Sequence, residues 1–318
     1  MAKIGYTLSS EEQDPVTLVA NAARAEEVGF SFAGISDHFH PWIDRQGESP
    51  FVWGALGAIS QATERLPVFT GVTCPTMRIH PAIVAHAAAT AAALLPGRFS
   101  LGVGSGENLN EHIFGDRWPA VPVRQARLEE AIEVIRLLWE GGLKSHRGTH
   151  YTVENARIYS LPEEPPPILV AVAGDKSVDI AARAGDGLIG TAPVAESIDR
   201  FRANGGEGKP TYGQLHVCWA QSEEEARRTV LEWWPNAALS GNHAFELPLP
   251  SHFEEVAELV GEDDVAESVV CGPDPERHVD AIREYVDAGY DHVYVHQIGP
   301  DQEGFFSFYE REVLPELS

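Results

Sequence analysis

The sequence predicts an α/β protein built as a closed barrel of eight parallel strands, with helices covering the outside. Strand-like and helix-like segments alternate from one end of the 318-residue chain to the other. About eight short apolar runs have the pattern of buried parallel strands, and most precede an amphipathic segment. The first of these runs lacks a following GxGxxG motif. Continuous alternation over this length therefore favours a barrel over a doubly wound sheet.

Four strand–helix pairs are expected in the first half of the chain. The strands are short apolar runs, and the helices have apolar residues three or four positions apart. Gly29 closes the first helix, and Pro81 stands in the first turn of the third. The expected pairs are 3–8 with 14–28, 32–36 with 50–63, 68–75 with 81–95, and 99–106 with 123–140.

The second half begins with an interruption and then resumes the alternation. Residues 141–167 alternate in polarity and predict a small hairpin, followed by a stiff proline-rich connector. Residues 236–262 are expected to be irregular or partly helical, and 275–288 to be a helix. The remaining pairs are 168–174 with 177–184, 186–191 with 197–203, 213–220 with 223–234, and 290–298 with 303–314. No linker could separate two domains, so residues 1–318 are expected to form a single TIM-barrel domain with insertions.

Composition excludes several classes of partner. The net charge is −25 with only four lysines, and the pI is near 4.8. Such a surface repels nucleic acid and anionic lipid. It suits either an ordinary acidic enzyme from a GC-rich genome or one adapted to high salt. No apolar run approaches the roughly 18 residues that a membrane span needs.

Cysteine usage and the first residues point to the cytoplasm. The three cysteines lie far apart, each in an apolar run, without metal-binding spacing: Cys74, Cys218 and Cys271. The chain begins without a basic-then-apolar signal pattern. A cytoplasmic enzyme with a small-molecule substrate is the expectation.

Chemistry in such barrels is found at the C-terminal ends of the strands. The predicted ends carry carboxylates, histidines, tryptophans and glycine-rich turns, a set that suits acid/base work on a bound ring system. His38 can take a hydroxyl proton near neutral pH, and Glu107 beside aromatic groups can exchange a second proton. Alternatively, His38 is merely hydrogen-bonded at a strand end and Glu107 pairs with an arginine. Together the two residues favour the catalytic interpretation.

Two turns are suited to ligand contact. Residues 102–111, "GVGSGENLNE", place three glycines at a strand end, where backbone can approach a ligand closely. Residues 173–180, "AGDKSVDI", put Gly174, Lys176 and Ser177 at a helix N-terminus, which favours an anion such as phosphate. A simple helix cap is the alternative there.

The spacing of His38 and His40 also occurs in metal-dependent hydrolase barrels. Those sites need further ligands on other strands, including a late aspartate. Here the final strand offers His296 and Gln297, and the histidine pair ends the second strand rather than the first. No metal is therefore expected, and a metal-dependent hydrolase remains a remote alternative.

Several stretches resemble one known family. They are "IGYTLSSEEQDP" at 4–15, "SDHFHPW" at 36–42, "TGVTCPTMRIHPAIVAHAAAT" at 70–90, "PGRFSLGVGSGENLNEHI" at 96–113 and "HYTVENARIYSLPE" at 150–163. They are similar to the luciferase-like barrel superfamily, and within it to the dehydrogenases that use coenzyme F420, a deazaflavin. The resemblance runs over residues 4–192 and 268–316.

The resemblance implies a deazaflavin across the barrel mouth and hydride transfer between a carbinol carbon and its C5 atom. It implies His38 as the base for the hydroxyl proton and Glu107 as the group near ring N1, with Trp42 and Glu11 beside the reacting centre. It implies a non-prolyl cis peptide at Gly71–Val72, behind the ring. The residues that match cofactor-binding positions are Asp37, Gly71, Val72, Cys74, Ser105, Gly106, Asn110, Ala173, Gly174, Lys176 and Ser177.

The substrate pocket departs from that of the sugar-phosphate enzymes in this family. Thr191 matches their phosphate-binding threonine, but Val194 stands at a lysine position, and the arginine position falls near Glu267 and Ser268. An acidic, lysine-poor pocket should bind a sugar phosphate poorly. The expected substrate is therefore an alcohol or unphosphorylated sugar. An FMN-dependent monooxygenase of the same superfamily is the alternative, and family members often form homodimers.

Overall fold

A closed parallel barrel forms the centre of the molecule. The computed structural model describes residues 2–239 and 243–317. The barrel strands are β1 (Lys3–Leu8), β2 (Phe32–Ile35), β3 (Val68–Thr70), β4 (Phe99–Val103), β7 (Ile168–Ala171), β8 (Gly187–Gly190), β9 (Thr211–Cys218) and β11 (His292–Gln297). Their order is β9–β11–β1–β2–β3–β4–β7–β8, and β8 pairs with β9 to close the circle. The expected (β/α)8 TIM barrel is confirmed.

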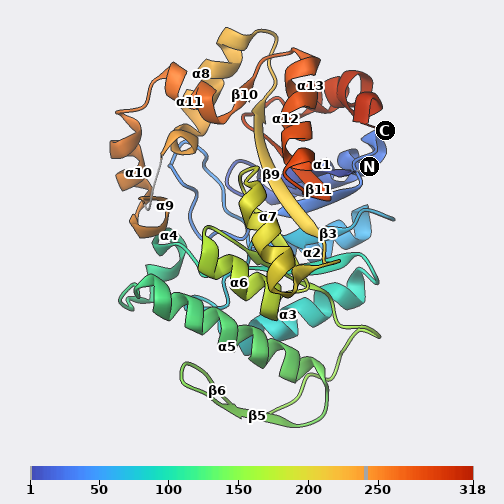
Figure 1. The fold of residues 1–318 in the computed structure, drawn as a ribbon, viewed down its shortest axis with the longest axis vertical. Coiled ribbons are helices and arrows are strands. Elements are labelled where there is room, and N and C mark those ends of the chain that lie inside the picture. Colours follow the sequence, from blue (N-terminus) through green and yellow to red (C-terminus); the bar gives the residue numbers. More distant parts are fainter. Residues whose placement is uncertain (1, 240–242, 318) are drawn as a thin grey trace.

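Helices surround this barrel (Figure 1). Local sequence signals determine where helices begin. At α1, for example, the Asp14 side chain accepts hydrogen bonds from the N–H groups of Val16 and Thr17, and a proline follows this capping residue. The helices are α1 (Pro15–Val28), α2 (Val52–Ala62), α3 (Pro81–Leu94), α4 (Asn108–Glu111), α5 (Val121–Trp139), α6 (Asp175–Ala184), α7 (Ala195–Phe201), α8 (Glu223–Trp233), α9 (His243–Glu246), α10 (Pro250–Ala257), α11 (Glu262–Ser268), α12 (Pro275–Asp287) and α13 (Gln302–Phe308). Within the described residues, none has both the length and the apolar character needed to cross a membrane.

A layer of large side chains fills the barrel interior. It comprises buried residues from five strands with Tyr212 packed against them: Phe32, Phe69, Leu169, Ile189 and Tyr294. Because side chains alternate along a strand, the next inward positions toward the C-terminal ends are two and four residues further on. On β2, β9 and β11 those positions include Ser36, His216 and His296. Polar groups therefore lie above an apolar floor.

A hairpin, β5 (Lys144–Arg147) with β6 (Thr152–Ala156), interrupts the alternation as expected, and its strands pair antiparallel. In Figure 1 it projects beyond α5. The Glu130 carboxylate on α5 accepts hydrogen bonds from the N–H groups of residues 149, 150 and 151. The Tyr151 hydroxyl lies 3.0 Å from the carbonyl oxygens of both Pro75 and Thr76. The hairpin is thus attached to the loop that follows β3.

The structure differs from the expected elements in several places: the short helices α4 and α11 were not predicted, α13 ends at Phe308, and two strands differ. The strand expected over 68–75 ends at Thr70, although Thr73 still forms an isolated parallel bridge with Val103 of β4. A short strand, β10 (Val270–Cys271), pairs with the end of β9 and was not predicted. The stretch 236–262 is partly helical as expected, although residues 240–242 lie outside the described part.

Candidate active site

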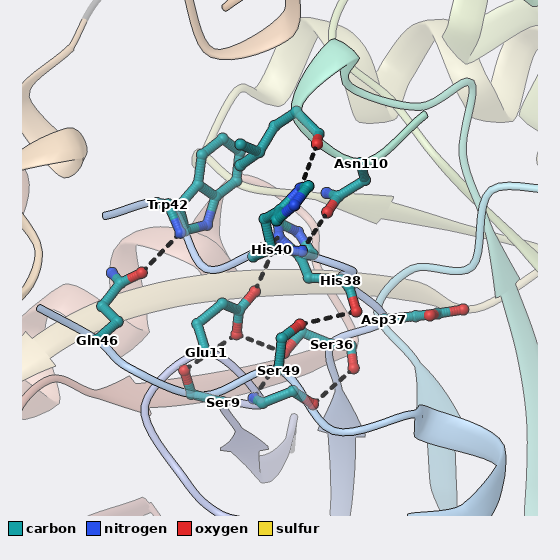
Figure 2. Close-up of polar contacts among 12 residues, drawn as sticks. Ser9, Glu11, Ser36, Asp37, His38, His40, Trp42, Gln46, Ser49 and Asn110 are labelled. Carbon is teal, nitrogen blue, oxygen red and sulfur yellow. Dashed lines mark hydrogen bonds and ion pairs between the residues drawn. The ribbon is translucent and has the colours of Figure 1, made fainter. Parts of the chain in front are cut away.

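A buried carboxylate and a histidine meet at the C-terminal ends of two neighbouring strands. Glu11 follows β1 and His38 follows β2. Oε1 of Glu11 lies 3.4 Å from Nδ1 of His38, and the two side chains are 3% and 9% exposed. The other carboxylate oxygen accepts hydrogen bonds from the hydroxyls of Ser36 at 2.6 Å and Ser9 at 3.2 Å (Figure 2). The carboxylate is therefore held in one orientation beneath the imidazole.

These contacts determine which nitrogen of His38 carries the hydrogen. Nδ1 also lies 3.2 Å from the carbonyl oxygen of His40. A carbonyl and an ionised carboxylate can only accept, so Nδ1 is the protonated nitrogen. Nε2 then presents a lone pair, and it has no hydrogen-bond partner among the described residues. A neutral imidazole in this form can accept a proton from a bound hydroxyl group.

Trp42 forms a wall beside this histidine. Its ring centroid is 5.0 Å from that of His38, and the two planes are inclined at 57°. The backbone N–H of Trp42 donates to the Gln46 side chain at 2.8 Å, and Gln46 in turn donates to the carbonyl of Trp233 at 3.0 Å. The ring of Phe253 packs edge-on against the indole. The indole is thus held beside the His38 ring.

A second buried network links the loops after β2, β3 and β4. The Asp37 carboxylate accepts from Arg78 Nη2 at 2.9 Å and from the Thr73 hydroxyl at 2.7 Å. Glu111 accepts from the backbone N–H of Arg78 at 2.8 Å, and its burial raises its pKa to about 7. Figure 2 shows the Asp37 side chain directed away from Glu11 and His38. Asp37 therefore positions the loop rather than the histidine.

The turn at 105–111 carries two further predicted residues, Asn110 and Glu107. Oδ1 of Asn110 accepts hydrogen bonds from the N–H groups of Phe39 and His40, at 2.8 and 3.1 Å, while its Nδ2 is buried without a partner among the described residues. Glu107 precedes α4, and its side chain has no hydrogen bond or ion pair in the described part of the chain. Burial raises the pKa of the Cys74 thiol, and the negative charge of Glu107 raises it further.

Backbone without side chains lines the adjacent wall. The Gly71–Val72 peptide is cis, as the resemblance implied. A Cβ on Gly104 would lie 2.7 Å from Cγ2 of Val72, and one on Gly106, where φ is +91°, would lie 2.9 Å from Cγ of Glu111. Ser105 lies between these glycines. Larger residues would not fit without displacing the wall.

The start of α6 has the features expected for an anion site. The Ser177 hydroxyl accepts from the N–H groups of Ala173 and Gly174, at 2.9 and 3.1 Å. Lys176 is exposed and pairs with no carboxylate among the described residues. The helix N-terminus adds a partial positive charge. Both the cap and the anion interpretation of this turn therefore remain compatible with the structure.

Other residues were missed or have a different role. Thr191 is exposed after β8, and its carbonyl accepts a hydrogen bond from Tyr285. Four polar residues near the site were not predicted from the sequence: Glu12, Arg78, Glu111 and His216. Period-two alternation along the ninth strand would have placed His216 inside the barrel, but nothing local distinguishes Glu12 from Glu11.

His40 supports the loop and does not face His38 across a metal site. Its Nδ1 lies 2.9 Å from the carbonyl oxygen of Leu109, and its ring stacks on that of His112 with centroids 5.9 Å apart. Within residues 2–239 and 243–317, no group of three or more His, Cys, Asp or Glu residues has an arrangement that could hold a metal ion. The metal-dependent hydrolase alternative is not favoured.

Comparisons with known proteins give consistent matches over the whole chain. The model of the family described as luciferase-like monooxygenase matches residues 1–292. The F420-dependent glucose-6-phosphate dehydrogenase of Amycolatopsis mediterranei (strain U-32) is 35% identical over 330 residues, covering 100% of this chain and 99% of the relative. The enzyme of the same description from Microbacterium testaceum (strain StLB037) is 34% identical, covering 99% and 97%. A solved F420-dependent secondary alcohol dehydrogenase, in complex with an F420–acetone adduct, is 30% identical with a TM-score of 0.91 and 98% coverage of both chains.

Proposed function

Because this chain belongs to the luciferase-like monooxygenase family, we propose that it is an F420-dependent oxidoreductase acting on the CH–OH group of an unphosphorylated alcohol or sugar. The observation that carries the proposal is the Glu11–His38 pair, whose geometry leaves a lone pair on Nε2 of His38. The two full-length relatives and the solved alcohol dehydrogenase are all described as F420-dependent dehydrogenases. FMN is the alternative cofactor, and the relatives at 30% identity or more do not favour it.

The residues around His38 can perform the proton transfers of alcohol oxidation. Bound F420 would supply a two-electron acceptor for the hydride of the carbinol carbon. Nε2 of His38 takes the hydroxyl proton, and the Glu11 carboxylate stabilises the imidazolium that results. The Trp42 ring covers one side of the reacting carbon. Glu107, which has no hydrogen bond or ion pair among the described residues, would exchange the proton that the bound ring gains or loses.

The wall opposite these residues fits a flat ring system. A Cβ on Gly104 or Gly106 would meet Val72 or Glu111, so the backbone at these two positions carries no side chain. Nδ2 of Asn110 is buried and lacks a protein acceptor among the described residues, so a ligand oxygen would satisfy it. We assign the ring and its ribityl chain to Asp37, the Gly71–Val72 peptide, Cys74, Ser105, Gly106 and Asn110.

We assign the cofactor phosphate to the N-terminus of α6. Lys176 is exposed beside this helix start and carries an unpaired positive charge among the described residues. Ser177 orients the preceding turn through Ala173 and Gly174. Phosphate binding at a helix N-terminus uses the unpaired N–H groups and the helix dipole.

We assign an unphosphorylated substrate because this chain lacks basic residues at positions where the sugar-phosphate enzymes bind phosphate. Val194, which stands where the sugar-phosphate enzymes have a lysine, is 43% exposed and apolar. The position of their arginine falls near Glu267 and Ser268 at the end of α11, whose first turn has Glu262, Asp263 and Asp264. A phosphate would find no cation from these positions, whereas Thr191 can still bind a hydroxyl group.

The first experiment is a parallel titration of the purified protein with F420 and FMN, followed by fluorescence. Saturable binding of F420 alone, followed by bleaching at 420 nm with alcohols or free sugars, is the expected result. Preference for FMN with oxygen-dependent turnover would contradict the cofactor assignment. Turnover of glucose 6-phosphate with a KM in the micromolar range would contradict the substrate assignment but leave the cofactor assignment intact.

We also infer that two copies of this chain form a homodimer through α2 and α3. Neither helix contains Asp, Glu, Lys or Arg, although the whole chain has 23 basic and 48 acidic residues. Ile83 and Leu94 on this face are 60% and 43% exposed, and they line a groove with Trp53 and Gly57. Light scattering should give a mass near twice 34.6 kDa. Ile83→Asp should give the monomer, and a monomeric wild type would refute the inference.

A further inference from the structure

A second glutamate–histidine arrangement lies beside the first and has no role in the chemistry above. Oε2 of Glu12 lies 2.7 Å from Nε2 of His296, and the two side chains are 2% and 1% exposed. Nδ1 of His296 lies 3.0 Å from Nδ1 of His216. Oε1 of Glu12 accepts a hydrogen bond from the N–H of Gly299. Glu12 after β1, His296 on β11 and His216 on β9 thus form a continuous chain of polar groups, in which the first two side chains are buried and His216 is partly exposed.

The direction of the hydrogen bonds along this chain follows from its carboxylate end. An ionised carboxylate only accepts, so Nε2 of His296 carries a hydrogen. In neutral His296 the other ring nitrogen is then an acceptor, and Nδ1–H of His216 donates to it. Burial, and next the neighbouring His296, lower the pKa of His216 to about 3, so this ring is neutral at physiological pH. Nε2 of His216 is left with a lone pair.

Nε2 of His216 lies at the same end of the barrel as His38. His216 and His296 are paired in register on β9 and β11. They follow Tyr212 and Tyr294 of the interior layer by four and two residues, so they project into the barrel above that layer. His216 is partly exposed, and its Nε2 has no hydrogen-bond partner among the described residues. The ring of Trp234 lies 4.5 Å from that of His296 and 6.2 Å from that of His216.

The two arrangements share one loop. Glu11 orients His38 and the next residue, Glu12, orients His296, so the strand order β9–β11–β1–β2 puts two histidines with bare Nε2 atoms on one arc of the barrel mouth. One of them is beside Trp42, where the reacting hydroxyl is assigned. The other has no reacting partner of its own.

We propose that Nε2 of His216 is a specificity-determining acceptor, which receives a hydrogen bond from a second hydroxyl group of the substrate. This rests on the proposed function and narrows it to diols and polyols without a phosphate. A neutral acceptor in a poorly solvated wall favours a hydroxyl donor and gives an anion no partner. The hydrogen bonds that run from His216 through His296 to Glu12 keep the hydrogen of His216 on Nδ1, so its Nε2 remains an acceptor.

The first test measures the hydrogen positions directly and does not depend on turnover. Long-range 1H–15N spectra of the 15N-histidine-labelled protein at pH 7.5 should show His216 protonated on Nδ1 and bare on Nε2, with the signal assigned by its loss in His216→Gln. Adding 1,2-propanediol to the F420-loaded protein should shift the Nε2 resonance, whereas 2-propanol should not. A hydrogen on Nε2, or the same response to both alcohols, would overturn the proposal.

The second test separates this proposal from the function on which it rests. In His216→Phe, kcat/KM for 1,2-propanediol should fall roughly three- to tenfold more than that for 2-propanol, the size of one neutral hydrogen bond. His216→Gln keeps an acceptor oxygen and should retain most of the preference for the diol. Equal losses with both alcohols would overturn the proposal. If F420 does not bind at all, the proposed function fails, and the proposal, which rests on it, is overturned too.

Discussion

Glu11 and His38 are joined by a 3.4 Å contact between Oε1 and Nδ1, while Ser9 and Ser36 hold the other oxygen of the carboxylate. Glu11 and His38 follow consecutive, paired strands of the barrel, so the two strand ends bring them together. The contact orients the imidazole with Nε2 outward. The first two predictions follow from this arrangement.

Replacing His38 by asparagine should abolish the proton transfer while leaving the pocket shape largely unchanged. We expect kcat to fall about 10²–10⁴-fold, the usual contribution of a general base. The affinity for F420 in the fluorescence titration should change little, because the assigned cofactor contacts lie on other residues. Replacing His252, which is half-buried on α10, in the same way is the matched control and should leave kcat unaltered. A variant at 38 with wild-type kcat would remove the histidine from the mechanism.

Glu11 acts through His38, so it is a positioning residue with a distinct signature. Glu11→Gln should lower kcat about 10–100-fold with little change in KM, because a neutral amide stabilises the imidazolium less than a carboxylate. Glu11→Asp, which keeps the charge, should recover part of the loss. Glu27→Gln, at an exposed position, serves as the control. Equal effects of the Gln and Asp variants would indicate a packing role only.

The buried Glu111 should make stability depend on pH. Its pKa is raised from 4.5 to about 7 in the folded protein. The folded state therefore binds this proton more tightly than the unfolded state, and the stabilisation is complete below pH 4.5 and is lost as pH rises through about 7. The contribution to the free energy of unfolding is on the order of 2–3 kcal/mol. Urea denaturation between pH 5 and 8 would measure it, and Glu111→Gln should flatten this part of the profile.

Gly106 should not tolerate a side chain. Gly106→Ala combines a left-handed backbone, with φ of +91°, and a Cβ 2.9 Å from Glu111. We expect a loss of about 1–3 kcal/mol in the free energy of unfolding, together with weaker F420 binding. Gly208→Ala has a φ of +77° but no atom within 4 Å of the added Cβ, so it isolates the backbone cost. Identical losses in both variants would show that the contact with Glu111 is unimportant.

Restoring a cation should widen the substrate range. Val194→Lys introduces an ammonium where Val194 is 43% exposed. We expect kcat/KM for glucose 6-phosphate to rise roughly tenfold, as for one charge-assisted hydrogen bond, with little change for free glucose. Val194→Gln provides a polar side chain without the charge. A similar gain from glutamine would show that polarity rather than charge limits phosphate binding.

The barrel and the position of its active end were predictable because the signals are local. Alternating apolar strands and amphipathic helices need no knowledge of distant contacts, and parallel strands bring Glu11, His38 and Glu107 to one end. Helix starts such as the one at Asp14 were equally local. The assigned roles of the site residues stay predictions.

What the sequence could not provide were the long-range pairings. Arg78 lies outside any predicted strand end, yet it bridges Asp37 and Glu111, which are 41 and 33 residues away. Glu11 and Glu12 are chemically identical neighbours, and only the twist of the chain after β1 sends one to His38 and the other to His296. The end of β3 at Thr70 was likewise not predicted.

The β5–β6 hairpin connects the outer surface to the loop beside the proposed cofactor site. Through the Tyr151 hydroxyl it contacts Pro75 and Thr76, which lie between Cys74 and Arg78 on the loop that borders the assigned ring site. Glu130 fixes the other end of that connection to α5. Sequence drift in an exposed insertion can therefore adjust the pocket without altering any residue that lines it. Substitutions in the hairpin could thus change the affinity for the proposed cofactor in small steps.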